Sequence, residues 1–235
     1  YNNGDNSNGE SKLAGKAFFP SDMNFNLFEY FHFCNQLLKK EPKKSNGRGQ
    51  SSDAPCMVMF CSFEQIPTLM QAAEKHGFVN RIPLEFIKNY SGQVLKANMR
   101  IVGATEYGIV LYRDRITKFR NGGKMIFNWM KWEKDGPEIP KCHPTQKVQS
   151  VLRRLIEVFT DPGDVVIDPV AGSGSTLRAA KDLGRNSYGF EIYKPFYQKA
   201  INEMLNENYS EYAMKQADKE TGQISIFDIG GVADD

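Results

Sequence analysis

Cysteine and long apolar runs are both scarce in this sequence. Its four cysteines stand far apart with no Cys-x-x-Cys pair, and only three histidines accompany them in 235 residues, so a structural zinc site is not expected. No stretch approaches the roughly 20 consecutive apolar residues that a membrane helix needs, and no signal-peptide pattern is present. These absences favour a cytoplasmic protein without a membrane partner. Cys34 and Cys61 lie in apolar surroundings and are predicted to be reduced core thiols.

The composition is that of an ordinary globular protein, with 40% hydrophobic and 25% charged residues. A chain of this length buries roughly 70–75% of its unfolded surface, which is enough for one large domain without covalent staples. The net charge of +2 is unevenly distributed: residues 81–135 carry eleven Lys and Arg against five Asp and Glu, whereas residues 203–235 carry two against eight. A basic middle is typical of a protein that binds a polyanion, although solvated basic faces are also common.

Hydrophobic periodicity predicts an alternation of helices and strands. Such an alternation favours a parallel sheet covered by helices on both faces. Residues 39–54, 91–103 and 119–142 show no regular period and are predicted as loops. Helices are predicted from about 21 to 38, 67–75, 148–159, from the glycine loop to about 184, and 195–206, and strands at 57–61, 78–88, 106–113, 164–168 and 187–191.

The strongest local signal is the segment 164–176, DVVIDPVAGSGST. A hydrophobic strand ends at Asp168, and Gly172 and Gly174 then permit a tight turn into a helix, which brings backbone N–H groups close to a ligand. Glu191 follows at the end of the next predicted strand, where a carboxylate can accept both ribose hydroxyls of a nucleoside cofactor. A phosphate ligand is less favoured because no P-loop Lys follows. A glycine turn that serves only strand–helix packing is the alternative.

Two motifs indicate a family. Residues 168–176 resemble the DPFxGSGTT motif of the DNA amino-methyltransferases, and residues 143–147, HPTQK, resemble the HPTQKP motif that precedes it in their circularly permuted beta class. The resemblance is specific over about residues 143–205 and looser over the earlier strands. Val148, Val170 and Ser175 depart from the family pattern, and none of them removes a donor that the cofactor needs.

This resemblance implies an α/β fold: a doubly wound, mostly parallel sheet with helices on both faces, Rossmann-like, as in S-adenosylmethionine-dependent methyltransferases, with a small irregular target-recognition insertion. It implies S-adenosyl-L-methionine as the cofactor, with Glu191 on the ribose, Asp168 near the ammonium group, and Lys147 and the Thr145 hydroxyl available for the carboxylate. The expected cofactor-binding residues are His143, Thr145, Gln146, Lys147, Asp168, Ala171, Gly172, Ser173, Gly174, Ser175 and Glu191.

The family's catalytic motif, (D/S)PP(Y/W), does not occur in this sequence. In the family, its Asp or Ser and the adjacent carbonyl orient the exocyclic amine of a flipped base, and its aromatic ring stacks on that base. Tyr1, followed by Asn-Asn-Gly, stands where the tyrosine of DPPYN would fall and is the predicted catalytic residue. We expect a chain that begins at Tyr1 to transfer methyl groups poorly. An arbitrary start at an exposed tyrosine is the alternative.

Residues 114–142 fall where the family places its target-recognition segment. Cations there alternate with aromatic residues, including Trp129 and Trp132, which suits double-stranded DNA: cations meet phosphates, and aromatic rings stack or wedge. A core position for at least one tryptophan is the plainer interpretation. The predicted DNA-binding residues are Arg113, Arg115, Lys118, Arg120, Lys124 and Lys131.

The leading prediction is therefore a DNA methyltransferase that acts on an exocyclic amine. Adenine N6 is favoured over cytosine N4, because a tyrosine after Asp-Pro-Pro fits the adenine enzymes better. A non-catalytic module that binds cofactor and DNA is the alternative from another class, and a nicotinamide-dependent oxidoreductase would leave HPTQK without a role. The predicted layout is a methyltransferase domain at 1–209, comprising a catalytic half at 1–113, the segment 114–142 and a cofactor-binding half at 143–209. Monomer and homodimer both remain open.

The acidic C-terminal segment, residues 210–235, is predicted to be a flexible tail. Within it, the peptide at 223–227, QISIF, resembles the short Gln-x-x-hydrophobic-Phe peptide by which bacterial replication and repair proteins dock on the sliding clamp. Gln223, Ile226 and Phe227 are the predicted partner-binding residues. A peptide that folds back onto the domain is the alternative.

Overall fold

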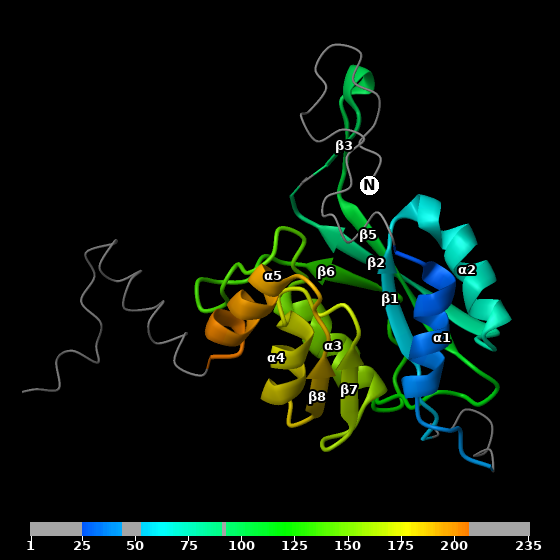
Figure 1. Cartoon of the computed structure of the whole chain (residues 1–235). Helices are drawn as coiled ribbons and strands as arrows, with labels where there is room; N and C mark the ends of the chain where they lie inside the picture. Colours follow the sequence, from blue (N-terminus) through cyan, green and yellow to red (C-terminus); the bar gives the residue numbers. More distant parts are fainter. Residues whose placement is uncertain (1–24, 44–52, 91–92, 207–235) are drawn as a thin grey trace, which may run out of the picture. The chain divides into compact units, whose positions relative to one another are not determined.

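The computed structural model describes residues 25–43, 53–90 and 93–206, which fall into two compact units (Figure 1). Unit 1 comprises the described residues up to Glu133 together with residues 153–164, and unit 2 comprises residues 134–152 and the described residues from Val165 onward. No helix within the described ranges is long and apolar enough to cross a membrane.

Unit 1 is built on a four-stranded sheet in the order β1-β5-β2-β6. Strand β5 is antiparallel to both of its neighbours, whereas β2 and β6 are parallel. Gly108 in β5 lies where an added Cβ would be 2.9 Å from the Phe86 ring of β2, so the close approach of the two strands requires glycine there. The strands are β1 (Met57–Cys61), β2 (Asn80–Lys88), β5 (Thr105–Tyr112) and β6 (Trp129–Trp132).

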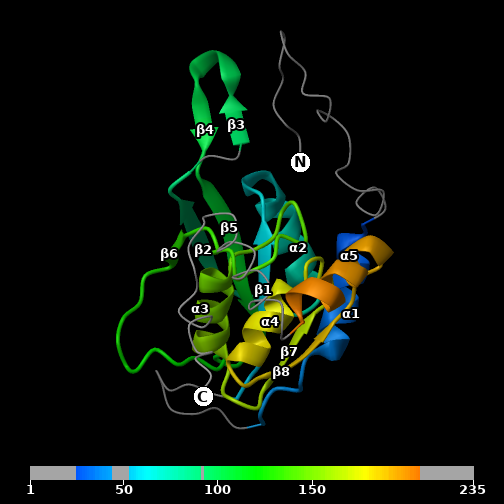
Figure 2. The same ribbon diagram turned by 90° about the vertical axis from the view of Figure 1, so that its left-hand side faces the viewer.

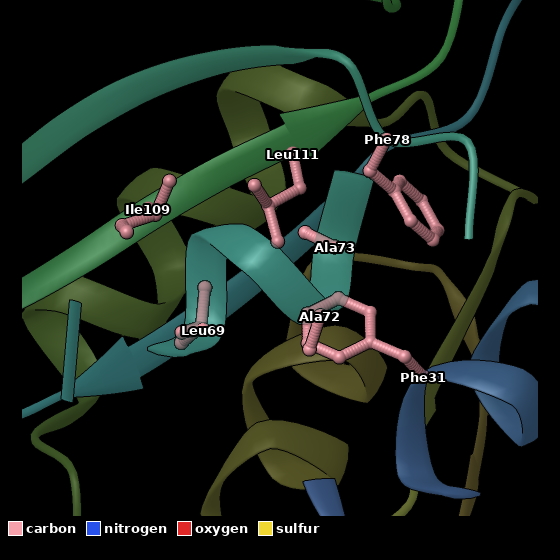
Figure 3. Close-up of a cluster of buried hydrophobic side chains, with 7 residues drawn as sticks. All are labelled: Phe31, Leu69, Ala72, Ala73, Phe78, Ile109 and Leu111. Atoms are coloured by element: carbon pink, nitrogen blue, oxygen red, sulfur yellow. The ribbon is translucent and has the colours of Figure 1, made fainter. Parts of the chain in front are cut away.

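Helices α1 (Leu27–Leu37) and α2 (Ile66–Lys75) supply much of the core of unit 1. The apolar stripe of α1 brings Phe31 against α2 and β5, where it is fully buried. The cap of α1 is Asn26, whose Oδ1 accepts from the N–H groups of Phe28 and Glu29 at 3.0 and 3.3 Å. Figure 3 shows the cluster, which consists of Phe31, Leu69, Ala72, Ala73, Phe78, Ile109 and Leu111.

The prediction of a loop over residues 91–103 is wrong. This stretch contains a β-hairpin, strands β3 (Gln93–Lys96) and β4 (Ile101–Gly103), joined by the 3₁₀ turn Ala97–Met99. The hairpin extends beyond the ends of β2 and β5 (Figures 1 and 2). From Val94 to Lys96 and at Ile101 and Val102 the side chains are exposed, so these strands show no alternation of apolar and polar residues from which a strand can be predicted.

Unit 2 contains the second, two-stranded parallel sheet. Strand β7 (Val165–Asp168) pairs with β8 (Asn186–Gly189), and α4 (Ser175–Asp182) connects them. Helix α5 (Lys194–Lys199) continues into a π-helical turn, Ala200–Met204. Helix α3 (Gln149–Phe159) begins in unit 2 and ends in unit 1.

The α/β class is confirmed. The two sheets differ from the mostly parallel sheet of the prediction: β7/β8 and β2/β6 are parallel pairs, whereas the two pairs that β5 makes are antiparallel. Strand β5 follows β2 through a hairpin rather than a helix, and a hairpin reverses the chain direction. Strand β6 lies in a region predicted to be irregular, and it is only four residues long.

Candidate functional site

The glycine loop after β7 is held by backbone hydrogen bonds to the segment that follows β8. The N–H of Ala171 donates to the carbonyl of Phe190 at 2.9 Å, and the N–H of Phe190 donates to the carbonyl of Asp168 at 3.0 Å. Gly172 and Gly174 adopt φ angles of +51° and +74°, which residues with a side chain rarely adopt. The loop after β7 and the segment after β8 are therefore joined directly by backbone hydrogen bonds.

Glu191 completes this fastening with its side chain. One carboxylate oxygen, Oε2, accepts from the N–H of Gly172 at 2.9 Å, and the other, Oε1, accepts from the N–H of Tyr193 at 2.7 Å. A carboxylate has about four acceptor positions, so each oxygen can still accept one more hydrogen bond. Glu191, the carboxylate predicted to bind the ribose, thus lies directly against the glycine loop.

Asp168 is the last residue of β7 and is half-buried. Its Oδ1 accepts from the N–H of Val170 at 3.1 Å. Burial raises the pKa of Asp168 above its usual value, hydrogen bonds from the Thr176 side chain and the Val170 N–H oppose the rise, and the charge of Glu191 adds to it. Asp168 at the end of β7 and Glu191 after β8 give the site a negative character, which a ligand with an ammonium group would compensate.

The HPTQK segment contributes His143 to the same neighbourhood. A Cβ added to Gly172 would lie 3.7 Å from His143 Cδ2, so the imidazole lies beside the loop. The imidazole packs edge-on against Phe196 of α5, with 4.2 Å between ring centroids, and its Nδ1 accepts from the Thr145 N–H at 3.2 Å. Aromatic packing and this hydrogen bond together fix the ring orientation.

Two further members of the motif have local roles. The Gln146 amide is used on both sides: Oε1 accepts from the Cys142 N–H at 3.0 Å, and Nε2 donates to the Pro140 carbonyl at 2.9 Å. These bonds shape the turn that precedes α3. Lys147 is half-buried.

The two serines of the loop point inward. Ser173 and Ser175 are 3% and 4% exposed, and their hydroxyls bond to each other at 3.1 Å. A Cβ added to Gly174 would lie 3.2 Å from the Ala200 Cβ, so this glycine packs tightly against the π-helical turn. Half-buried Ala171 contacts the opposite loop through its N–H, as described above. The serine side chains therefore stabilise the start of α4, and any ligand contact from this stretch falls to the backbone.

Sequence reasoning missed Gln149, which joins the two motifs. This residue is 5% exposed; its Nε2 donates to the Ser175 carbonyl at 3.0 Å and its backbone N–H donates to Asp135 Oδ1 at 2.8 Å. Burial raises the pKa of Asp135, and the bond from Gln149 opposes that rise. The amide of Gln149 thereby ties the start of α3 to the start of α4. A glutamine at a helix start is too common to be singled out in a sequence.

Four of the six predicted DNA-binding cations have partners inside unit 1. Lys118 Nζ lies 2.6 Å from Asp164 Oδ2 and 3.0 Å from Asp161 Oδ2. Arg120 donates twice to Asp161 at 2.6 Å, which, with the contribution of Lys118, lowers the pKa of Asp161 to about 2. Arg113 Nη2 and Arg115 Nη2 donate to the Lys39 and Lys43 carbonyls at 2.8 and 3.2 Å. Lys124 and Lys131 are exposed.

The two tryptophans have different surroundings. Trp132 is 3% exposed and packs edge-on against Phe86, with Lys88 Nζ 4.9 Å from its ring centre, so the prediction that at least one tryptophan is a core residue is confirmed. Trp129 is 41% exposed and stacks on Phe127 at 5.7 Å. Of the two tryptophans, Trp129 is therefore the one available to an external ligand.

Four predicted site residues lie outside the described residues: Tyr1, Gln223, Ile226 and Phe227. Their assignments stay predictions. Within the described ranges, no group of three or more His, Cys, Asp or Glu side chains is arranged to hold a metal ion.

Comparison with known proteins assigns this architecture to a family. The family model of DNA methylases for N6 and N4 amines matches residues 1–203. The chain belongs to this DNA methylase family. The match covers both compact units, so the methylase core includes the hairpin-bearing sheet as well as the glycine loop.

Relatives and solved structures agree with this assignment. The chain is 31% identical over 142 residues to the putative methylase YubD of Escherichia coli K12, a match that spans 60% of the chain and 58% of YubD. It is 26% identical over 219 residues to the DNA adenine methyltransferase YhdJ of the same organism, covering 85% of the chain and 73% of YhdJ. The crystal structure of the M1.HpyAVI–SAM complex has a TM-score of 0.62 at 28% identity, covering 78% of this chain and 84% of that one. The cytosine-N4-specific PvuII DNA methyltransferase, at 16% identity and a TM-score of 0.56, shows the shared fold; the match covers 72% of this chain and 71% of that one.

Proposed function

We propose that this protein binds S-adenosylmethionine in unit 2 and transfers its methyl group to an exocyclic amine of a DNA base. In this proposal Glu191 accepts hydrogen bonds from the ribose hydroxyls, and the backbone of the glycine loop lies against the methionine part. The acidic pair of Asp168 and Glu191 favours the ammonium group, and the Thr145 hydroxyl and Lys147 meet the carboxylate. The bound cofactor supplies an electrophilic methyl group on sulfur, which the amine nitrogen attacks.

One observation carries the proposal: the Gly172 N–H donates to Glu191 Oε2 at 2.9 Å. This bond orients the carboxylate over the loop and leaves acceptor positions on both oxygens, which is the arrangement that a ribose diol requires. M1.HpyAVI, which is 28% identical to this chain, was crystallised as a complex with the same cofactor.

Adenine N6 is the proposed target position. The name of YhdJ, whose match covers 85% of this chain, specifies adenine, whereas the cytosine-specific PvuII enzyme is similar at 16% identity only. Duplex DNA is the proposed substrate because unit 1 has exposed cations and an exposed aromatic pair, Phe127 and Trp129.

Two measurements test the proposal. Isothermal titration calorimetry with S-adenosylhomocysteine should give a one-to-one complex. Any tritium transferred from labelled S-adenosylmethionine to unmethylated bacterial DNA should then be found in N6-methyladenine after hydrolysis to nucleosides. N4-methylcytosine in the product would replace the proposed base, and an absence of cofactor binding would overturn the proposal.

The C-terminal peptide supports a second interaction. Gln223, Ile226 and Phe227 have the spacing of a sliding-clamp ligand, with an amide for anchoring hydrogen bonds and two adjacent apolar side chains for a preformed pocket. A pull-down with the bacterial clamp, comparing the native chain with Ile226→Ala/Phe227→Ala, should show capture of the native chain alone. If the native chain is not captured and the double substitution lowers stability, the peptide folds back on the protein.

A further inference from the structure

The β3–β4 hairpin of unit 1 exposes an unusual amount of apolar surface. Its five exposed large apolar side chains are between 44% and 67% accessible. Exposed apolar residues concentrated on one projecting element are typical of an interaction surface. The residues are Val94, Leu95, Met99, Ile101 and Val102.

The same hairpin is positively charged. Residues 93–103 contain Lys96 and Arg100 and no acidic residue. Neither cation takes part in an ion pair or hydrogen bond among the described residues. The hairpin therefore combines apolar contact area with two available cations, and its charge is complementary to a polyanion.

Arg100 occupies a position that would suit glycine better. Its φ of +56° is the only positive φ of a non-glycine residue in the part of the chain that the structure describes. Left-handed backbone disfavours a residue with a Cβ atom. A tight turn alone would be satisfied by glycine, so the backbone geometry does not account for an arginine at this position.

The hairpin continues into the sheet face that carries Ile109 and Leu111, at an end of β2 and β6 where the side chains are exposed. Strand β2, which leads into the hairpin, pairs with β6 in parallel, and the pairs Glu85/Trp129 and Ile87/Lys131 lie on the side opposite buried Phe86. Trp129, Lys131 and Ile87 are exposed there. This face of β2 and β6 thus exposes apolar side chains and Lys131 together with the acidic Glu85, and it lies beside the exposed aromatic pair of Phe127 and Trp129.

We infer that the β3–β4 hairpin is a DNA-binding arm that enters a groove of the duplex. A two-stranded ribbon has the width of the major groove. Lys96 and Arg100 would contact phosphates on its two sides, and Met99 at the turn would contact base edges. This inference rests on the proposed function, and it adds a DNA-contacting element outside residues 114–142.

Fluorescence anisotropy with a labelled 30-base-pair duplex tests the arm, using the full 235-residue chain. Lys96→Gln/Arg100→Gln should weaken binding roughly five- to tenfold per contact at 0.1 M salt and lower the slope of log affinity against log salt by about 0.9 per contact. Lys75→Gln/Arg154→Gln, which removes the same charge from helices α2 and α3, is the matched control and should have a much smaller effect.

Two single variants separate contact from folding. Arg100→Gly should raise thermal stability, because it relieves the left-handed backbone, and should still weaken DNA binding. Met99→Ser should weaken binding without changing the salt slope. Equal DNA affinity of native chain and all hairpin variants would overturn the inference.

The outcomes distinguish this inference from the proposed function. If the native chain binds S-adenosylhomocysteine but no DNA at any salt concentration, the proposed substrate is wrong, and the inference that the hairpin binds DNA is wrong as well. If the native chain binds DNA and the hairpin variants bind equally well, only the arm is wrong. Sedimentation of the same variants shows whether the hairpin joins two copies of the chain: conversion of a dimer to a monomer with unchanged DNA affinity would replace DNA by a second copy as its partner.

Discussion

The glycine-loop region of unit 2 and the hairpin face of unit 1 are built in opposite ways. The loop is shaped by its backbone: two glycines with positive φ, N–H groups bonded to Phe190 and Glu191, and inward-facing serines. The hairpin face is shaped by side chains, with apolar and cationic residues exposed on a simple two-stranded ribbon. A site for one small cofactor needs fixed geometry, whereas a surface for DNA needs area and charge.

The largest effect is expected at Glu191, which accepts a hydrogen bond from the glycine loop and is proposed to bind the ribose. Glu191→Ala removes two hydrogen bonds to a charged acceptor, about 1.5–3 kcal/mol each, and should weaken S-adenosylhomocysteine at least a hundredfold by calorimetry. Glu191→Gln keeps one oxygen acceptor, so its affinity for S-adenosylhomocysteine should lie between those of the native chain and of Glu191→Ala. An unchanged dissociation constant in the alanine variant would contradict the ribose assignment.

A pair of glycines tests whether the loop depends on its backbone. Gly174 and Gly184 have nearly the same φ, +74° and +73°, but an added Cβ meets the Ala200 Cβ at 3.2 Å in the first case and nothing within 4 Å in the second. Alanine should cost about 1–2 kcal/mol of stability at Gly184 and somewhat more at Gly174. Cofactor affinity, measured together with the melting temperature, should fall for Gly174→Ala and not for Gly184→Ala. Equal losses of stability and of cofactor affinity in the two variants would show that packing against the π-helical turn is unimportant.

The same contrast explains which features the sequence could predict. The glycine loop and Glu191 are local features, because each follows a short apolar strand and is positioned by a tight turn. Gln149 and the Lys118–Asp164 pair join residues 26 and 46 positions apart, and no local pattern records such a contact. The hairpin was missed for a different reason: Val94, Leu95, Ile101 and Val102 lack a buried face, so the period of two that identifies strands is absent.

The ion pairs around Lys118 should contribute to stability rather than to DNA affinity. Lys118→Met leaves Asp161 and Asp164 without their shared cation and should lower the free energy of unfolding by about 1–2 kcal/mol at pH 7. This cost is intermediate between those of losing an exposed and a buried ion pair. Urea unfolding followed by tryptophan fluorescence measures this, since both tryptophans lie in unit 1. A change in the salt slope of DNA binding with unchanged stability would instead place Lys118 at DNA.

The pH dependence follows from the lowered pKa of Asp161, which the bonds from Arg120 and Lys118 bring from 3.8 to about 2. A carboxyl group whose pKa is lower in the folded state stabilises the fold at any pH above its pKa in the unfolded chain. This stabilisation is lost as the pH falls through the folded-state pKa. The native chain should therefore lose this contribution between about pH 4 and pH 2. Asp161→Asn should be less stable than the native chain at pH 6, and the difference should shrink toward pH 2.

The smallest effect is expected at Lys124 and Lys131, which are exposed; Arg120, the third exposed cation of the predicted set, is bonded to Asp161. Neither lysine has an ion-pair partner among the described residues, so Lys124→Gln/Lys131→Gln should leave the urea midpoint unchanged. Removing a phosphate interaction should flatten the salt slope by about 0.9, in contrast to Lys118→Met, which should change the midpoint and leave the slope alone. Because Lys131 pairs across the sheet with Ile87 at the root of the hairpin, combining its substitution with Arg100→Gly should add the two slope changes if both cations contact one duplex. A double variant with the slope of Arg100→Gly alone would show that the sheet face does not contact DNA.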